Sequence, residues 1–128
     1  MRIFGLLAIV ALAVTAAAFV SDTRSASADA STCSAWGCDY ASAKFQSYGE
    51  HFIICDNEVD GYGAAVQYTT NGQNVHTLIN DTGGNNCIDI NKSWKESTRI
   101  AFWVCHERHG VVYTNTCGDP VTTTAAND

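Results

Sequence analysis

The sequence predicts a small all-β protein: an antiparallel β-sandwich of six to seven strands, stapled by disulfides, with an irregular N-terminal arm. Three observations support this prediction. Short segments alternate between apolar and polar residues, turn signals separate these segments every eight to twelve residues or so, and the chain contains six cysteines. The sequence shows no internal repeat and no convincing amphipathic helix. The strand pattern also fits a small barrel, but we favour the sandwich.

The first 28 residues have the three parts of a signal peptide. Met1-Arg2 is a short positive start, Ile3–Val20 is almost entirely apolar, and Ser21–Ala28 is polar and small. The last part ends in Ala26-Ser27-Ala28, an A-x-A pattern that signal peptidase accepts, and Ala28-Asp29-Ala30 offers a second cut. An uncleaved membrane anchor is the alternative, since the apolar run reaches the lower limit for spanning a bilayer. We expect cleavage and a secreted, extracellular protein.

The remaining 100 residues are enough for one domain. We divide them into an N-terminal arm with a weak first strand (29–49), a β-sandwich core (50–117) and a flexible C-terminal tail (118–128). The chain has 13 acidic and 7 basic residues and a net charge of −6. Nucleic-acid binding needs a basic patch, so we expect no nucleic-acid partner. We also expect no membrane contact after signal cleavage.

The cysteines indicate a disulfide framework, because their number is even and the chain is short and exported. Among the many possible connectivities we choose the sequential one: Cys33–Cys38, Cys55–Cys87 and Cys105–Cys117. Zinc is the alternative, but no two cysteines have the C-x2-C spacing typical of structural zinc sites. We therefore expect three disulfides, no metal site and no cofactor.

Seven segments carry the strand pattern. Glu50–Asp56 is strongly apolar, and Thr98–Cys105 is the most apolar of all and is expected to be the central strand. Tyr62–Thr70 and Gln73–Asn80 flank Asn71-Gly72, the strongest hairpin signal in the chain, which predicts a type I′ turn. That turn would place Tyr68 opposite Val75, Val66 opposite Thr77 and Ala64 opposite Ile79 on the core face. The other strand segments are Ser42–Tyr48, Cys87–Ile90 and Val111–Thr116.

The acidic turn Asp56–Gly61 resembles the first half of an EF-hand calcium loop. Carboxylates stand at loop positions one, three and five, and a glycine stands at position six. The twelfth position, which should be a bidentate glutamate, is Gln67, and no helices flank the loop. We favour an acidic hairpin loop with Gly61 at positive φ, with a weak calcium site as the alternative.

A second chemically suggestive cluster is His106-Glu107-Arg108-His109. Its histidines are three residues apart, so it does not match the zinc motif H-E-x-x-H. A small secreted nuclease-type toxin would use a glutamate base, a histidine acid and an arginine for the phosphate. We interpret the cluster as a solvated turn and keep the nuclease, with Glu107 and His109, as an alternative. We assign no catalytic residue.

The aromatic residues give the strongest functional signal. Trp103, Phe52 and Phe102 fall inside strands and are expected in the core. Four others fall in loops or in the arm, where aromatic side chains are candidate anchors for a partner: Trp36, Tyr40, Tyr62 and Trp94. They predict a non-enzymatic protein-binding module that uses them together with the arm Asp29–Tyr40. An inhibitor of an extracellular hydrolase, with Trp36 or Trp94 as the probe residue, is the alternative.

One set of residues also resembles a known group of proteins. The set contains Phe52, Cys55, Asp56, Asp60, Gly61, Ala65, Val66–Tyr68, Val104, Cys105 and Cys117. It is similar to small secreted actinobacterial β-proteins of the Streptomyces type, some of which are adaptors in umbrella-type toxin particles. Such adaptors join a lectin subunit to a toxin stalk through an N-terminal strap. The resemblance implies a lectin or toxin subunit as partner, whereas the inhibitor alternative implies a hydrolase.

Overall fold

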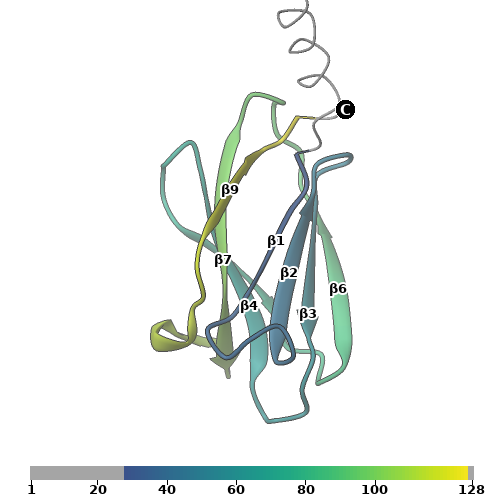
Figure 1. The fold of residues 1–128 in the computed structure, drawn as a ribbon, viewed down its shortest axis with the longest axis vertical. Coiled ribbons are helices and arrows are strands. Elements are labelled where there is room, and N and C mark those ends of the chain that lie inside the picture. Colours follow the sequence, from purple (N-terminus) through teal and green to yellow (C-terminus); the bar gives the residue numbers. More distant parts are fainter. Residues whose placement is uncertain (1–27, 127–128) are drawn as a thin grey trace, which may run out of the picture.

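The fold is described from a computed structural model, which describes residues 28–126 (Figure 1). The predicted signal peptide falls almost entirely outside these residues. Within them, nine strands form two antiparallel sheets that pack face to face. The predicted disulfide-stapled β-sandwich is therefore confirmed, but the described residues form nine strands instead of the six to seven predicted. In the same part of the chain, no helix is long and apolar enough to cross a membrane.

The first sheet has the strand order β1-β2-β3-β6. Burial alternates along β2 and β3, as expected for strands with one face on a core. Phe45 and Phe52 face inward, whereas Cys55 and Cys87 form a cross-strand pair on the outer face. The strands are β1 (Ala30–Cys33), β2 (Ala41–Gln46), β3 (His51–Asp56) and β6 (Asn86–Asn91).

The second sheet has the order β5-β4-β7-β8, and β9 also pairs with β7. The strand β7 is central, as predicted, because β4 lies on one side of it and β8 and β9 share the other. The strands are β4 (Gly63–Thr70), β5 (His76–Asn80), β7 (Arg99–Arg108), β8 (Val111–Tyr113) and β9 (Val121–Thr124), and the 3-10 turn η1 (Thr114–Thr116) follows β8.

The core between the sheets is built around aromatic rings. Phe52 lies at its centre, with ring centroids 5.1 Å from Phe45, 5.2 Å from Phe102 and 5.3 Å from Tyr68. Such tilted and edge-on contacts add to the stabilisation from apolar burial. The three disulfides have the predicted sequential pairing, and all six cysteines are bonded.

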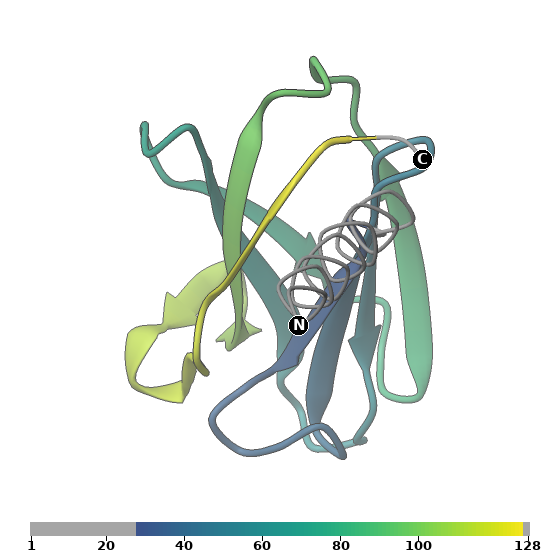
Figure 2. The ribbon, with the colours of Figure 1, turned by 45° about the horizontal axis from the view of Figure 1, so that its top comes forward.

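Two segments that we expected to be irregular are strands. The first part of the predicted arm forms β1, so only the loop 34–40 is irregular, and part of the predicted flexible tail forms β9. The two strands lie beside one another and close one edge of the sandwich (Figure 2). There Thr32 Oγ1 donates a hydrogen bond to the Asp119 carbonyl at 2.9 Å, and the Thr123 hydroxyl donates to the Ala28 carbonyl. Both strands are polar and are held by their neighbours, which is why apolar alternation does not reveal them.

The predicted hairpin turn is correct, but its register is wrong by one residue. Asn71 and Gly72 have φ of 52° and 73°, and Gln73 N donates to Thr70 O at 3.0 Å. Two residues of the β5 side then stand opposite Thr69, and this bulge shifts every later pair. Tyr68 pairs with His76 instead of Val75, Val66 with Leu78 instead of Thr77, and Ala64 with Asn80 instead of Ile79. As a result Leu78 packs on the core and Val75 is exposed.

Candidate functional site

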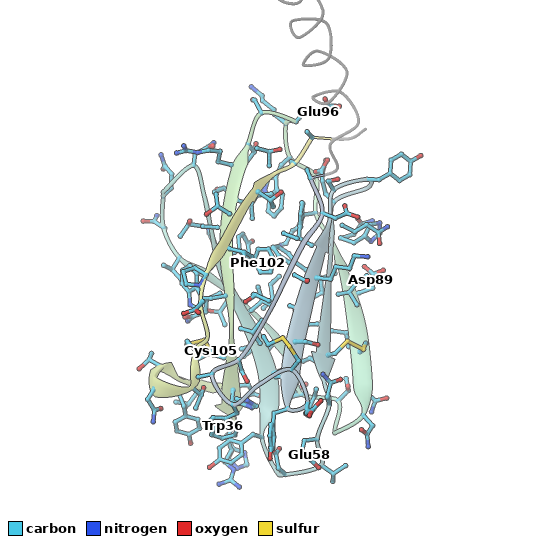
Figure 3. The ribbon with its side chains drawn as sticks, in the orientation of Figure 1. Trp36, Glu58, Asp89, Glu96, Phe102 and Cys105 are labelled. Atoms are coloured by element: carbon cyan, nitrogen blue, oxygen red, sulfur yellow. A yellow bond between two sulfur atoms is a disulfide. The ribbon has the colours of Figure 1, made fainter. Side chains whose placement is uncertain are left out.

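Four connections leave the sandwich at the same end, which we call the loop end. They follow β1, β3, β5 and β7 and comprise residues 34–40, 57–62, 81–85 and 109–110. Trp36 and Glu58 both lie at this end (Figure 3), and the described part of the chain begins before β1 and ends after β9 at the opposite end (Figure 1). Loops held by a rigid scaffold are a common location for binding residues.

The loop end carries a group of touching aromatic rings, the aromatic cluster, defined as Trp36, Tyr40, Tyr62 and Tyr113. The Trp36 ring centroid lies 5.4 Å from that of Tyr62 and 6.2 Å from that of Tyr40, both edge-on, and Tyr62 meets Tyr113 at 5.8 Å. Trp36 is 42% exposed and Tyr40 39% exposed. The structure thus brings three of the four predicted binding residues together and adds Tyr113, which the sequence analysis missed.

The backbone around Trp36 is fixed from several sides. The Cys33–Cys38 disulfide closes the loop, and Gly37, at a φ of 111°, makes a turn that a side chain would strain. Gly37 N donates to Ser34 O at 3.0 Å, and Ala35 N donates to Thr116 O at 2.9 Å. The loop is therefore ordered before any partner arrives, which lowers the entropic cost of binding.

His106 lies beneath Trp36 and is buried, which corrects the prediction of a solvated turn at His106–His109. The strand β7 continues to Arg108, and the core-facing alternation of Ile100, Phe102 and Val104 extends to His106. The His106 and Trp36 rings are stacked, with centroids 3.9 Å apart. Burial lowers the pKa of His106, an effect that the charge of Asp60 partly offsets. A neutral imidazole thus supports the Trp36 ring from below.

Ser34 and His106 form a hydroxyl–imidazole pair, with 2.8 Å between Ser34 Oγ and His106 Nε2. A serine nucleophile also needs a group that orients the histidine and N–H donors for an oxyanion. Among the described residues His106 Nδ1 has no hydrogen-bond partner, and the amides of Ser34 and Ala35 already donate to the carbonyls of Ala41 and Thr116. The geometry therefore fits a structural hydrogen bond that secures the Trp36 loop to β7.

A cleft of about 430 Å³ opens beside the aromatic cluster, between the β3–β4 loop, the β5–β6 loop and the β7–β8 turn. Tyr62 belongs to both the cluster and the cleft wall. We call this space the acidic cleft, because five carboxylates line it together with Arg108 and His109: Asp56, Glu58, Asp60, Asp81 and Glu107.

Two of these carboxylates are almost completely buried. Asp56 and Glu107 are each 2% exposed. Glu107 Oε2 accepts a hydrogen bond from Gly110 N at 3.0 Å, and Asp56 Oδ1 accepts one from Glu58 N at 3.3 Å. Burial raises the pKa of Asp56, the Glu58 N–H opposes this, and the negative charges of Asp60, Glu107 and Glu58 raise the pKa further.

The buried position of Glu107 depends on a glycine. Gly63 stands opposite Glu107 in the β4–β7 ladder. A Cβ at position 63 would overlap the Glu107 carboxylate and would approach the Asn80 carbonyl oxygen to 2.7 Å. The missing side chain therefore makes room for a carboxylate at the base of the acidic cleft.

The EF-hand-like turn is a loop with Gly61 at positive φ, as we favoured, but the prediction of a hairpin was wrong, because the strands that it joins, β3 and β4, belong to different sheets. Gly61 has a φ of 81°, and Asp60 Oδ1 accepts a hydrogen bond from Tyr62 N at 3.0 Å. Between residues 28 and 126, no group of three or more His, Cys, Asp and Glu side chains is arranged to hold a metal ion.

Two tryptophans lie away from the loop end. Trp94, the fourth predicted binding residue, is half-buried in the β6–β7 connection and packs on the core, with its ring centroid 5.6 Å from that of Tyr68. Its backbone N–H donates to the Glu50 carboxylate. Trp103, expected in the core, is only partly buried, and its Nε1 donates to Gln67 Oε1 at 3.0 Å.

The geometry gives little support to the alternative of a nuclease that uses Glu107 and His109. The Glu107 carboxylate already accepts the Gly110 N–H within the β7–β8 turn, whereas His109 is exposed. The surrounding carboxylates would repel a phosphate group. The cleft is better suited to a positively charged ligand.

No family model, curated protein or solved structure matches the chain significantly. The class of the protein is therefore defined by its own architecture: a disulfide-stapled antiparallel β-sandwich with an acidic cleft and an aromatic cluster at one end.

Proposed function

We propose that this chain is a secreted, non-enzymatic protein-binding module, adaptor-like, that docks through the aromatic cluster at its loop end. The observation that carries the proposal is Trp36, which is 42% exposed although its loop is closed by a disulfide and its ring is stacked on His106. Rigid, partly exposed tryptophan and tyrosine side chains are the usual anchors of protein interfaces. Three disulfides in a small β domain also fit an extracellular protein.

The proposed contact is narrower than the arm that the sequence suggested. Deleting Asp29–Tyr40 would also remove β1 from the first sheet, so it would test stability as well as binding. The loop 34–40 is the appropriate target. A lectin or toxin subunit of an extracellular toxin complex is the partner that we expect from the resemblance to adaptor proteins.

An inhibitor of an extracellular hydrolase is the second candidate. The observation that favours it is the short disulfide loop that presents Trp36 as a rigid probe. The two candidates differ in the captured partner: a hydrolase in one case, a lectin or toxin subunit in the other.

The test compares Trp36→Ala with Tyr48→Ala. Tyr48 is 72% exposed in the β2–β3 turn, at the other end of β2 from the loop 34–40, and is therefore a matched control. Each protein, carrying a C-terminal tag, is incubated with culture supernatant, and the captured proteins are identified by mass spectrometry. We expect Trp36→Ala to weaken capture at least tenfold, on the order of a hot-spot loss, and Tyr48→Ala to have no effect. Unchanged capture by a folded Trp36→Ala variant would overturn the proposal.

A further inference from the structure

We propose that the acidic cleft receives a lysine or arginine side chain of the partner protein while the aromatic cluster packs against the surface around it. This inference rests on the proposed function, because it assigns the chemistry of the residue that the loop end recognises. Four observations support it. The carboxylates of the cleft are buried, Arg108 contacts Tyr62 and Gly61 instead of these carboxylates, the walls of the cleft are closely packed, and Tyr62 belongs to both the cleft and the aromatic cluster.

The buried carboxylates of the cleft lack a counter-charge. Asp56 and Glu107 are each 2% exposed, a degree of burial that acidic side chains rarely reach unless they are paired. Between residues 28 and 126 no lysine or arginine forms an ion pair with either of them, and the ion pair found there joins His51 to Asp89. A cation from outside the chain would supply the missing charge.

The one arginine in the cleft wall does not fill this role. The Arg108 guanidinium lies over the Tyr62 ring, 4.6 Å from its centroid, and Arg108 Nε donates to the Gly61 carbonyl at 3.3 Å. These contacts hold the arginine against the β3–β4 loop, and among the described residues it forms no ion pair with Asp56 or Glu107.

The cleft is formed before binding. Gly84 of the β5–β6 loop packs so closely on the β3–β4 loop that a Cβ there would lie 2.6 Å from the Glu58 carbonyl oxygen. Gly63 of β4 packs just as closely, because a Cβ there would overlap the Glu107 carboxylate. The volume of about 430 Å³ lies in the range of ligand pockets, about 300–1,000 Å³.

The surroundings of the cleft favour a protein side chain over a free metal ion. No group of three or more His, Cys, Asp and Glu side chains in the described part of the chain is arranged for a metal. The apolar aromatic cluster adjoins the cleft through Tyr62, which lines the cleft and contacts Trp36. A basic residue next to an apolar patch on the partner would match both the charge and the apolar surface.

The first experiment titrates the full secreted protein with a small probe and follows backbone amide shifts by NMR. The probes are N-acetyl-arginine methylamide, the corresponding lysine compound, the neutral citrulline compound and calcium chloride. We expect the arginine or lysine compound to shift the amides of Asp56, Gly63 and Glu107 in a saturable way, and the citrulline compound to leave them unchanged. Equal shifts with citrulline, or shifts with calcium alone, would overturn the inference.

The second experiment uses variants that remove charge but keep shape. Asp56→Asn and Glu107→Gln each retain an oxygen for the existing backbone hydrogen bond, and Asp89→Asn removes an exposed carboxylate elsewhere as the control. We expect the double variant to lose the probe-induced shifts and to reduce partner capture at least tenfold, and Asp89→Asn to behave like the wild type. If the double variant does not fold, Asp56→Asn alone gives the same comparison.

The outcomes separate this inference from the proposed function. Loss of capture in Trp36→Ala, with full capture by the double charge variant, would leave the docking role intact and refute the basic side chain. Unchanged capture in Trp36→Ala would refute the docking role itself. Loss of capture in both, together with weaker wild-type capture at high salt, would support both.

Discussion

Removal of the Cys55–Cys87 disulfide is expected to cost much more stability than removal of Cys33–Cys38. The three disulfides join cysteines 5, 32 and 12 positions apart, in chain order. The entropy that a cross-link removes from the unfolded chain grows with the logarithm of the loop length, which gives about 2.1, 3.7 and 2.8 kcal/mol at 25 °C. The loops do not overlap, so together they contribute about 8.6 kcal/mol, comparable to the whole stability of a small domain.

The Cys33–Cys38 and Cys55–Cys87 pairs can be compared directly. Cys87 and Cys38 are exposed and their partners Cys55 and Cys33 only partly buried, so alanine at these positions leaves no large cavity. Cys105 is fully buried, so its replacement would add a cavity cost and would blur the effect of loop length. We expect Cys55→Ala/Cys87→Ala to lose about 1.6 kcal/mol more than Cys33→Ala/Cys38→Ala.

Urea unfolding followed by tryptophan fluorescence measures both variants, and the slope of the transition reports changes in the unfolded state. Equal losses with equal slopes, or a larger loss for Cys33→Ala/Cys38→Ala, would refute the loop-entropy reasoning. The second outcome would mean that the short loop stabilises the native state directly.

Three further changes test the described contacts. Asp56→Asn is expected to stabilise the fold at neutral pH. Folding raises the pKa of Asp56 above 3.8, so just above that pH the folded state binds more protons than the unfolded state. The stability of the wild type therefore falls as the pH rises through this window, and the uncharged asparagine avoids this loss. Thermal melts from pH 3.5 to 7 check this, and parallel profiles for both proteins would contradict it. Gly63→Ala should cost about 1–3 kcal/mol through the clash with Glu107, and Glu107→Ala should restore part of the loss if the clash is the cause. Truncation before Pro120 should lower the melting temperature because it removes β9 from β7, and an unchanged melt would show that this strand contributes nothing.

The sequence predicted the features that depend on local pattern. Glu50–Asp56 and Thr98–Cys105 could be recognised because apolar side chains define their core faces, and both became strands of the sandwich. The turn at Asn71-Gly72 is also a local feature, and the sequential disulfide pairing joins each cysteine to its neighbour in the cysteine order. Trp36, Tyr40 and Tyr62 were identified as loop aromatics, although nothing in the sequence showed that they touch.

The sequence did not predict the features that depend on distant neighbours. The bulge opposite Thr69 shifts the β4–β5 register without a glycine or proline to mark it. His106 and Glu107 look like surface residues, yet β7 carries them into buried positions opposite Ala64 and Gly63. A signal for His106 existed, because the alternation of β7 continues through it, but its polar character argued against extending the strand.

The seam between β1 and β9 brings the two ends of the domain together, far from the loops that carry the aromatic cluster. Ala28 accepts a hydrogen bond from Thr123, and Ala125 N donates to Thr98 O at that same end. The ten residues of β7 span the distance between the two ends, about 33 Å at the usual rise per residue. A tether, a label or a neighbouring domain joined before Ala28 or after Ala126 would therefore leave the loop end with its aromatic cluster unobstructed.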